Sequence, residues 1–134
     1  MDVHMMLSLF HMAVVVPLLL FVGYQRSDTP QWVYLSLLSI GLVVLLYHTV
    51  RLVQRYGRSS FVWVNILHIL TVAPLLCYIG WYGRDTPRWA YELILILGFG
   101  AGGYHLFQFV KGLEAYPETQ RKAAISKSDN LYSL

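Results

Sequence analysis

The chain alternates long uncharged stretches with short polar segments. Four largely uncharged stretches cover roughly residues 5–24, 30–50, 60–82 and 88–110. Each of them reaches the about 20 residues that a helix needs to cross a bilayer core of about 30 Å. This pattern predicts an all-α membrane protein with four transmembrane helices.

The composition agrees with a membrane protein. Of the 134 residues, 57% are hydrophobic and 13% are charged, and the mean hydropathy is +0.52, which is too apolar for an ordinary soluble domain. The first apolar stretch lacks the basic start and the small-residue cleavage site of a signal peptide, so we expect it to remain as a helix. The pI near 9.1 does not indicate nucleic-acid binding, because the basic residues gather at the expected membrane edges.

The chain contains an internal repeat. The segment from His11 to His48 recurs from His68 to His105, and every shared residue is displaced by 57 positions (68 − 11). About a third of the aligned positions are identical without a gap, which predicts a tandem duplication. We expect a first copy over 1–54, with spans at 5–24 and 30–50, and a second over 55–112, with spans at 60–82 and 88–110.

The number of spans and the positive charges predict the topology. Each copy has two spans, so both copies enter the membrane from the same side, as parallel repeats related by a pseudo-two-fold axis along the membrane normal. Basic residues are concentrated in the middle loop and after the last span, which places both termini in the cytoplasm. The polar residues 113–134 are expected to form a disordered cytoplasmic tail. The basic residues concerned are Arg51, Arg55, Arg58, Lys111, Arg121, Lys122 and Lys127.

Four histidines lie at a similar depth near the cytoplasmic face of the expected bundle. A helical wheel places small or polar residues on the face of each histidine, so the histidines should point into the bundle. Ionisable residues inside a membrane are costly and by default indicate function. The histidines are His11, His48, His68 and His105, and their faces carry Ser8, Asn65, Thr71, Gly41, Gly98 and Gly102.

Three functions fit a layer of four histidines. The first is a metal or haem site used in electron transfer, with the four histidines as ligands to haem b, zinc or copper. The second is an oligomeric proton or ion channel, or a pH sensor, in which Tyr47 and Tyr104 extend the layer and Tyr34 and Tyr91 form a second one. The third is a structural or assembly subunit of a membrane complex, in which the histidines specify helix packing.

The remaining repeated residues have structural interpretations beside functional ones. Pro17 and Pro74 lie within spans and predict either packing kinks or hinges. The Asp-Thr-Pro loops predict helix starts capped by threonine, followed by tryptophans at headgroup level, although their aspartates could also bind a cation or a partner on the outer face. These aspartates and tryptophans are Asp28, Asp85, Trp32 and Trp89.

Cys77 and Glu92 are single residues outside the repeated pattern. Cys77 should face lipid, on the side of its helix away from His68. Glu92 lies inside the last span, where snorkelling or an oligomer contact is expected, with Arg84 or Arg88 as its ion-pair partner. No catalytic motif occurs in the sequence, so a stand-alone enzyme is not expected. A homo-oligomer or a subunit of a membrane complex fits a chain of this size.

Overall fold

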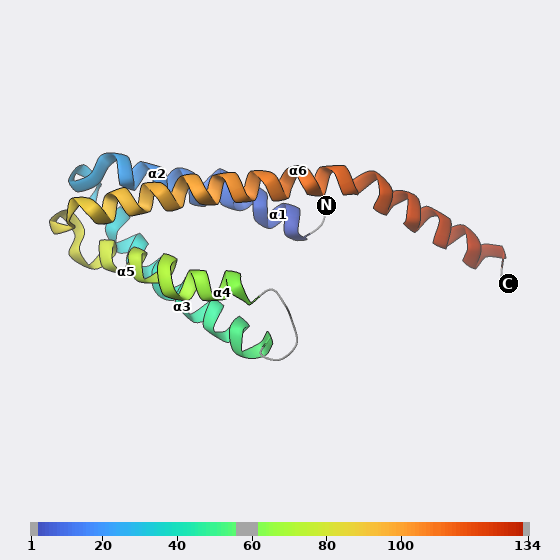
Figure 1. The fold of residues 1–134 in the computed structure, drawn as a ribbon, viewed down its shortest axis with the longest axis horizontal. Helices are drawn as coiled ribbons and strands as arrows, with labels where there is room; N and C mark the ends of the chain where they lie inside the picture. The colour runs from blue at the N-terminus through green and yellow to red at the C-terminus, as the bar shows by residue number, and fades with distance from the viewer. Residues whose placement is uncertain (1–2, 56–61, 133–134) are drawn as a thin grey trace. The chain divides into compact units, whose positions relative to one another are not determined.

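The computed structural model describes residues 3–55 and 62–132, and every regular element in these ranges is a helix (Figure 1). The first half contains α1 (Val3–Phe10), the π-helical segment η1 (His11–Val15), α2 (Val16–Gln25), the short 3-10 turn η2 (Arg26–Asp28) and α3 (Gln31–Arg55). The second half contains α4 (Trp63–Leu67), the π-helical segment η3 (His68–Val72), α5 (Ala73–Tyr82), the 3-10 turn η4 (Gly83–Asp85) and α6 (Arg88–Tyr132).

Four helical stretches of the described chain are long and apolar enough to cross a membrane. They cover Val3–Asp28, Gln31–Gln54, Trp63–Asp85 and Arg88–Ala115. This confirms the all-helical prediction and the prediction of four helices that are long and apolar enough to span a membrane. Three of the four stretches are longer than their predicted counterparts, because polar residues at the ends continue the helices. Trp63–Asp85 has the same 23 residues as the predicted stretch 60–82 but begins three residues later.

The chain forms two compact units. The first comprises Met1–Leu18 with Gly98–Leu134, and the second comprises Leu19–Leu97. Neither unit coincides with a predicted copy, because helices from different copies pack together. In the second unit, for example, α3 of the first copy makes its main contacts with α5 of the second.

Glycines allow α3 and α5 to approach closely. A Cβ atom added to Gly80 would lie 2.5 Å from the backbone nitrogen of Leu38, and one added to Gly41 would lie 2.7 Å from Sγ of Cys77. Cys77 therefore faces α3, and the prediction that it faces lipid is wrong. A regular helical wheel that starts at His68 misplaces Cys77, because the π-helical segment η3 lies between the two residues and changes the angle between their side chains.

The threonines of the Asp-Thr-Pro loops do not act as predicted. Thr29 and Thr86 are buried and precede α3 and α6. The Thr86 hydroxyl donates to the carbonyl oxygen of Ile79 over 3.4 Å, so it fastens the loop to the end of α5. The buried Thr29 hydroxyl has no hydrogen-bond partner within residues 3–55 and 62–132.

The last helix extends beyond its expected end. Residues past Gly112 were expected to be disordered, whereas α6 continues to Tyr132 with Pro117 inside it. Many residues after this proline have high helix propensity, including glutamate, glutamine, arginine, lysine and alanine. Helix propensity therefore favours a helix in this segment, although its polar side chains predicted a disordered tail.

Candidate functional site

Two of the repeated histidines begin π-helical segments. His11 opens η1 and His68 opens η3, and Pro17 and Pro74 each follow six positions later (17 − 11 and 74 − 68). Proline has no N–H group, and its ring crowds the preceding turn. A wider π-helical turn accommodates that defect, and such turns occur frequently at functional sites.

The same two histidines are held by their own helices. Nδ1 of His11 lies 2.8 Å from the carbonyl oxygen of Leu7, and Nδ1 of His68 lies 2.7 Å from that of Val64. A carbonyl oxygen only accepts, so Nδ1 carries the hydrogen in both rings. In the neutral imidazole, Nε2 then presents its lone pair to a proton or a metal ion.

The first unit contains a stacked histidine pair. The rings of His11 and His105 have centroids 4.1 Å apart and planes 21° apart, and both residues are half-buried. The Tyr104 ring packs edge-on against His105 at 5.2 Å. One turn before His105, a Cβ on Gly102 would lie only 3.4 Å from Val16, so the helices lie close together beside the pair.

The second unit contains an equivalent pair. The rings of His48 and His68 have centroids 4.0 Å apart and planes 17° apart. Nδ1 of His48 also lies 2.9 Å from Oδ1 of Asn65, which is 5% exposed. The ring of Tyr47 packs edge-on against His48 at 5.1 Å.

The pairing follows the repeat, although the sequence interpretation treated the four histidines as one layer and missed it. A displacement of 57 converts the pair His11 and His105 into His68 and His48 (11 + 57 and 105 − 57). The first helical stretch therefore pairs with the last, and the second pairs with the third. The constant offset of 57 already related these two pairings to each other.

The arrangement of the pairs bears on the expected cofactors. Within the described residues, no group of three or more His, Cys, Asp or Glu side chains is placed to hold a metal ion. A porphyrin needs its two imidazoles edge-on to the iron from opposite faces, whereas each pair here is stacked face to face at about 4 Å. The stacked pairs therefore do not fit a haem held between their two rings.

A second polar cluster joins two repeated tyrosines. The hydroxyl oxygens of Tyr34 and Tyr91 lie 2.8 Å apart. Tyr34 also donates to the carbonyl oxygen of Arg26 over 2.7 Å, and Tyr91 donates to that of Gly83 over 3.0 Å. Both side chains are buried, and each ties its helix to the 3-10 turn before it.

Arg26 has an unusual backbone that the sequence analysis did not identify. Its φ is +52°, a left-handed value, and Gly83 at the equivalent position has φ +55°. Glycine adopts this region without cost, whereas a non-glycine residue in a sparsely populated region costs about 1–3 kcal/mol. The alignment of Arg26 with Gly83 was the signal that could have revealed the strain.

The other predicted residues are spread over both units. Glu92 bonds to Arg88, with Oε1 2.6 Å from Nε, which confirms one of its two expected partners. Ser8, Gly41 and Gly98 are buried and Gly102 is half-buried, whereas seven further predicted residues are exposed. The exposed group comprises Thr71, Pro17, Pro74, Asp28, Asp85, Trp32 and Trp89.

No family model, curated protein or solved structure matches the chain.

Proposed function

We propose that this chain is an integral membrane protein that binds one proton at each stacked histidine pair and uses this charge to sense pH or to pass protons on. The observation that carries the proposal is the pairing itself, in which two imidazole rings face each other at about 4 Å in each unit.

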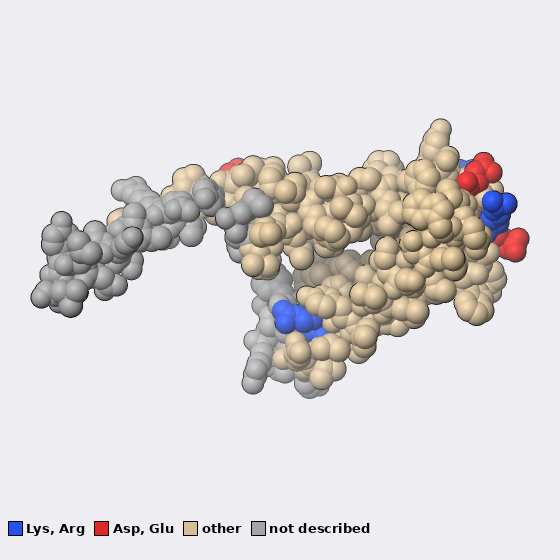
Figure 2. Space-filling model, turned by 180° about the vertical axis from the view of Figure 1, so that it is seen from behind, with Lys and Arg blue, Asp and Glu red and all other residues tan. Residues whose placement is uncertain are grey.

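Exposed apolar side chains support a membrane location. Leu70, Phe99 and Leu46 are 71%, 69% and 67% exposed, although each lies within a span. Figure 2 shows a largely uncharged surface along the helices, with acidic and basic groups gathered near their ends. Lipid is the solvent in which such a surface is stable. The basic middle loop and tail favour a cytoplasmic location of both termini.

Matched contacts support the tandem duplication. Tyr34 bonds to the carbonyl of Arg26 as Tyr91 bonds to that of Gly83, and each atom pair is displaced by 57 positions. The close contact of Gly80 with Leu38 recurs as a contact of Gly23 with Leu95. Two copies of one two-helix unit, related by a pseudo-two-fold axis, account for both correspondences.

Charge repulsion limits each pair to one proton. Histidine is the side chain whose charge ordinarily changes between pH 5 and 8. Two positive charges on rings stacked about 4 Å apart repel each other, so a pair that holds one proton opposes the binding of a second. Tyr47 and Asn65 beside the second pair, and Tyr104 beside the first, are neutral polar groups that can accept or donate a hydrogen bond without supplying a charge.

Proton counting tests the proposal. We would follow the imidazole nitrogens by ¹⁵N NMR in the full chain in nanodiscs between pH 8 and pH 5, with His4→Asn removing the exposed fifth histidine. The four paired histidines are expected to take up about two protons. Uptake of four protons by independent rings would overturn the proposal.

A single substitution in one pair sharpens the test. In His68→Gln, the remaining His48 ring can still take one proton, so the count for that pair should stay at one. Independent histidines would lose one proton on the same substitution. In liposomes, a proton flux that His48→Gln abolishes would assign a relay, and retained proton binding without flux would assign a sensor.

A metal site is the second candidate, and one observation favours it. Metal-binding histidines usually donate their other N–H group to a carbonyl oxygen, as His11 and His68 do. Nε2 of each ring would then be the ligand, and water or a second copy of the chain would supply the remaining ligands of zinc or copper. Stoichiometric zinc retained through dialysis in the wild type and lost in His68→Gln would support this candidate, and equal retention in both would refute it.

A further inference from the structure

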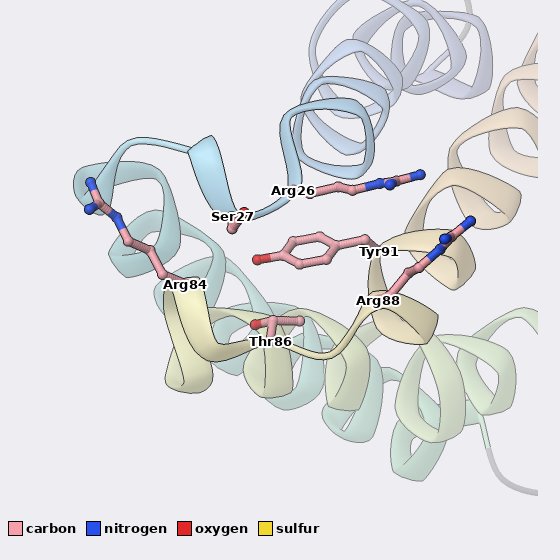
Figure 3. A pocket seen from close by; sticks show the side chains of 6 residues that line it. All are labelled: Arg26, Ser27, Arg84, Thr86, Arg88 and Tyr91. Carbon is pink, nitrogen blue, oxygen red and sulfur yellow. The ribbon is translucent and has the colours of Figure 1, made fainter.

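A pocket lies at the end of the second unit opposite its histidine pair. Residues from η2, η4 and the first turn of α6 line a pocket of about 280 Å³ (Figure 3). Its lining contains three arginines and three hydroxyl-bearing residues and no carboxylate. The lining residues are Arg26, Ser27, Arg84, Thr86, Arg88 and Tyr91.

The side chains in the pocket are arranged to receive an anion. Figure 3 shows the guanidinium groups of Arg26 and Arg88 extended toward the same side, whereas Arg84 points away from them. Nε of Arg88 is bonded to Glu92, which leaves its two terminal nitrogens to donate. Arginine forks match the oxygens of a phosphate group in a bidentate manner.

The backbone of Arg26 gives a second, independent reason. This residue holds a left-handed φ of +52°, and the equivalent position holds Gly83. A strained residue at an otherwise glycine-compatible position points to a role for its side chain. The other two arginines also lack a counterpart, because Arg84 aligns with Ser27 and Arg88 aligns with Gln31. The basic pocket is therefore built once and is not part of the repeated pattern.

We infer that this pocket binds a phosphate oxyanion, held mainly between Arg26 and Arg88. Three carboxylates occur in the same region, at Asp28, Asp85 and Glu92, but none lines the pocket. They moderate the affinity and leave the recognition to the guanidinium forks. The oxyanion can come from a lipid headgroup, since the pocket lies beside the end of a span, or from a free phosphate.

Two probes distinguish these sources. The first is inorganic phosphate added to the full chain in a neutral detergent, with binding followed by the thermal midpoint and by Arg side-chain NMR signals. The second is a set of vesicles containing phosphatidylglycerol or only phosphatidylcholine, into which the same protein is reconstituted. Binding of phosphate supports a free-anion site, and a response to phosphatidylglycerol alone supports a headgroup site. A response to neither probe overturns the inference.

The decisive variant is Arg26→Gly, which carries the residue found at the equivalent position 83. It removes a guanidinium group and relieves the backbone, so the protein should fold at least as well as the wild type while affinity for the responding probe falls about tenfold or more. Arg88→Gln should weaken binding similarly, Arg84→Gln should have a smaller effect, and Glu92→Gln should strengthen it. Unchanged affinity in Arg26→Gly would refute the site.

The histidine proposal is unaffected by this test. The pocket shares no residue with either stacked pair, so Arg26→Gly should leave the proton count unchanged. A matched control is Arg51→Gln, which removes a positive charge from the other end of α3 and should leave the affinity for either probe unchanged. An equal loss in Arg51→Gln and Arg26→Gly would show only a general charge effect and would overturn the assignment of the pocket.

Discussion

The segments His11–His48 and His68–His105 share their internal contacts and differ at their polar edges. Each segment contributes a histidine that opens a π-helical segment, and a second histidine that stacks on the first histidine of the other segment. Each also contributes a buried tyrosine that bonds to a 3-10 turn. They differ where Arg26 aligns with Gly83 and where Leu35 aligns with Glu92. Just outside the segments, Ser8 aligns with Asn65 in the same way.

The difference separates two kinds of position. Residues that touch the other copy are held by both sides of a contact, so a change in either would disturb two helices. Arg26 and Glu92 are exposed, so each copy can carry its own chemistry there, whereas Asn65 is buried and bonds to His48. The proton sites we propose belong to the shared set, whereas the phosphate pocket belongs to the set found once.

The largest effect is expected when the close packing of α3 against α5 is disrupted. In Gly80→Ala, the new Cβ would lie 2.5 Å from the nitrogen and 2.8 Å from Cα of Leu38, and neither backbone atom can move aside alone. We expect α3 and α5 to separate and the free energy of unfolding to fall by about 1–3 kcal/mol. Denaturation in detergent measures this loss, and NMR should show changed signals for His48 and His68.

Gly100→Ala is the matched control for that substitution. A Cβ at Gly100 meets no atom within 4 Å, so the helix should gain about 0.5–1 kcal/mol from the alanine. Equal stability of the two variants would show that the close approach of α3 and α5 contributes nothing.

A smaller effect should follow when the second pair is made to resemble the first. Asn65→Ser removes the acceptor 2.9 Å from Nδ1 of His48 and installs the residue found at position 8. A hydrogen bond between membrane helices contributes about 0.6–1.7 kcal/mol, so stability should fall by that amount.

Denaturation in detergent measures this loss, and the imidazole ¹⁵N signals show which pair is affected. The His11 and His105 signals serve as the internal reference, because both rings belong to the other unit. Unchanged stability, or equal signal changes in both pairs, would contradict the role given to Asn65.

The sequence predicted the elements better than the contacts between them. Uncharged length identified the four helices that are long and apolar enough to cross a membrane, because this is a local property of about 20 residues. The fixed offset identified the histidines and tyrosines as special positions. Which histidine meets which depends on helix pairing, and amphipathic patterning is weak in helices that are apolar on every face.

Local backbone departures explain the remaining differences. The π-helical turn between His68 and Cys77 rotates one relative to the other, so a uniform 100° wheel misplaced the thiol. The left-handed Arg26 is an exception to residue preference, and such exceptions cannot be derived from preference. The phosphate pocket depends on that exception, which is why the sequence pointed only to the aspartates of the same loops.

The smallest effect concerns the ion pair that only one copy carries. Glu92→Leu installs the residue found at the equivalent position 35 and removes the bond to Arg88. The two side chains are 47% and 75% exposed, so solvent screens the pair, and basic-before-acidic is the weaker order on a helix. We expect the free energy of unfolding in detergent to change by less than about 0.5 kcal/mol, and the difference to shrink further in high salt. Glu92→Gln separates loss of charge from gain of apolar surface. A loss above about 1 kcal/mol in both variants would show that Glu92 has a buried partner, such as a second copy of the chain, and that the copies differ in more than their solvated edges.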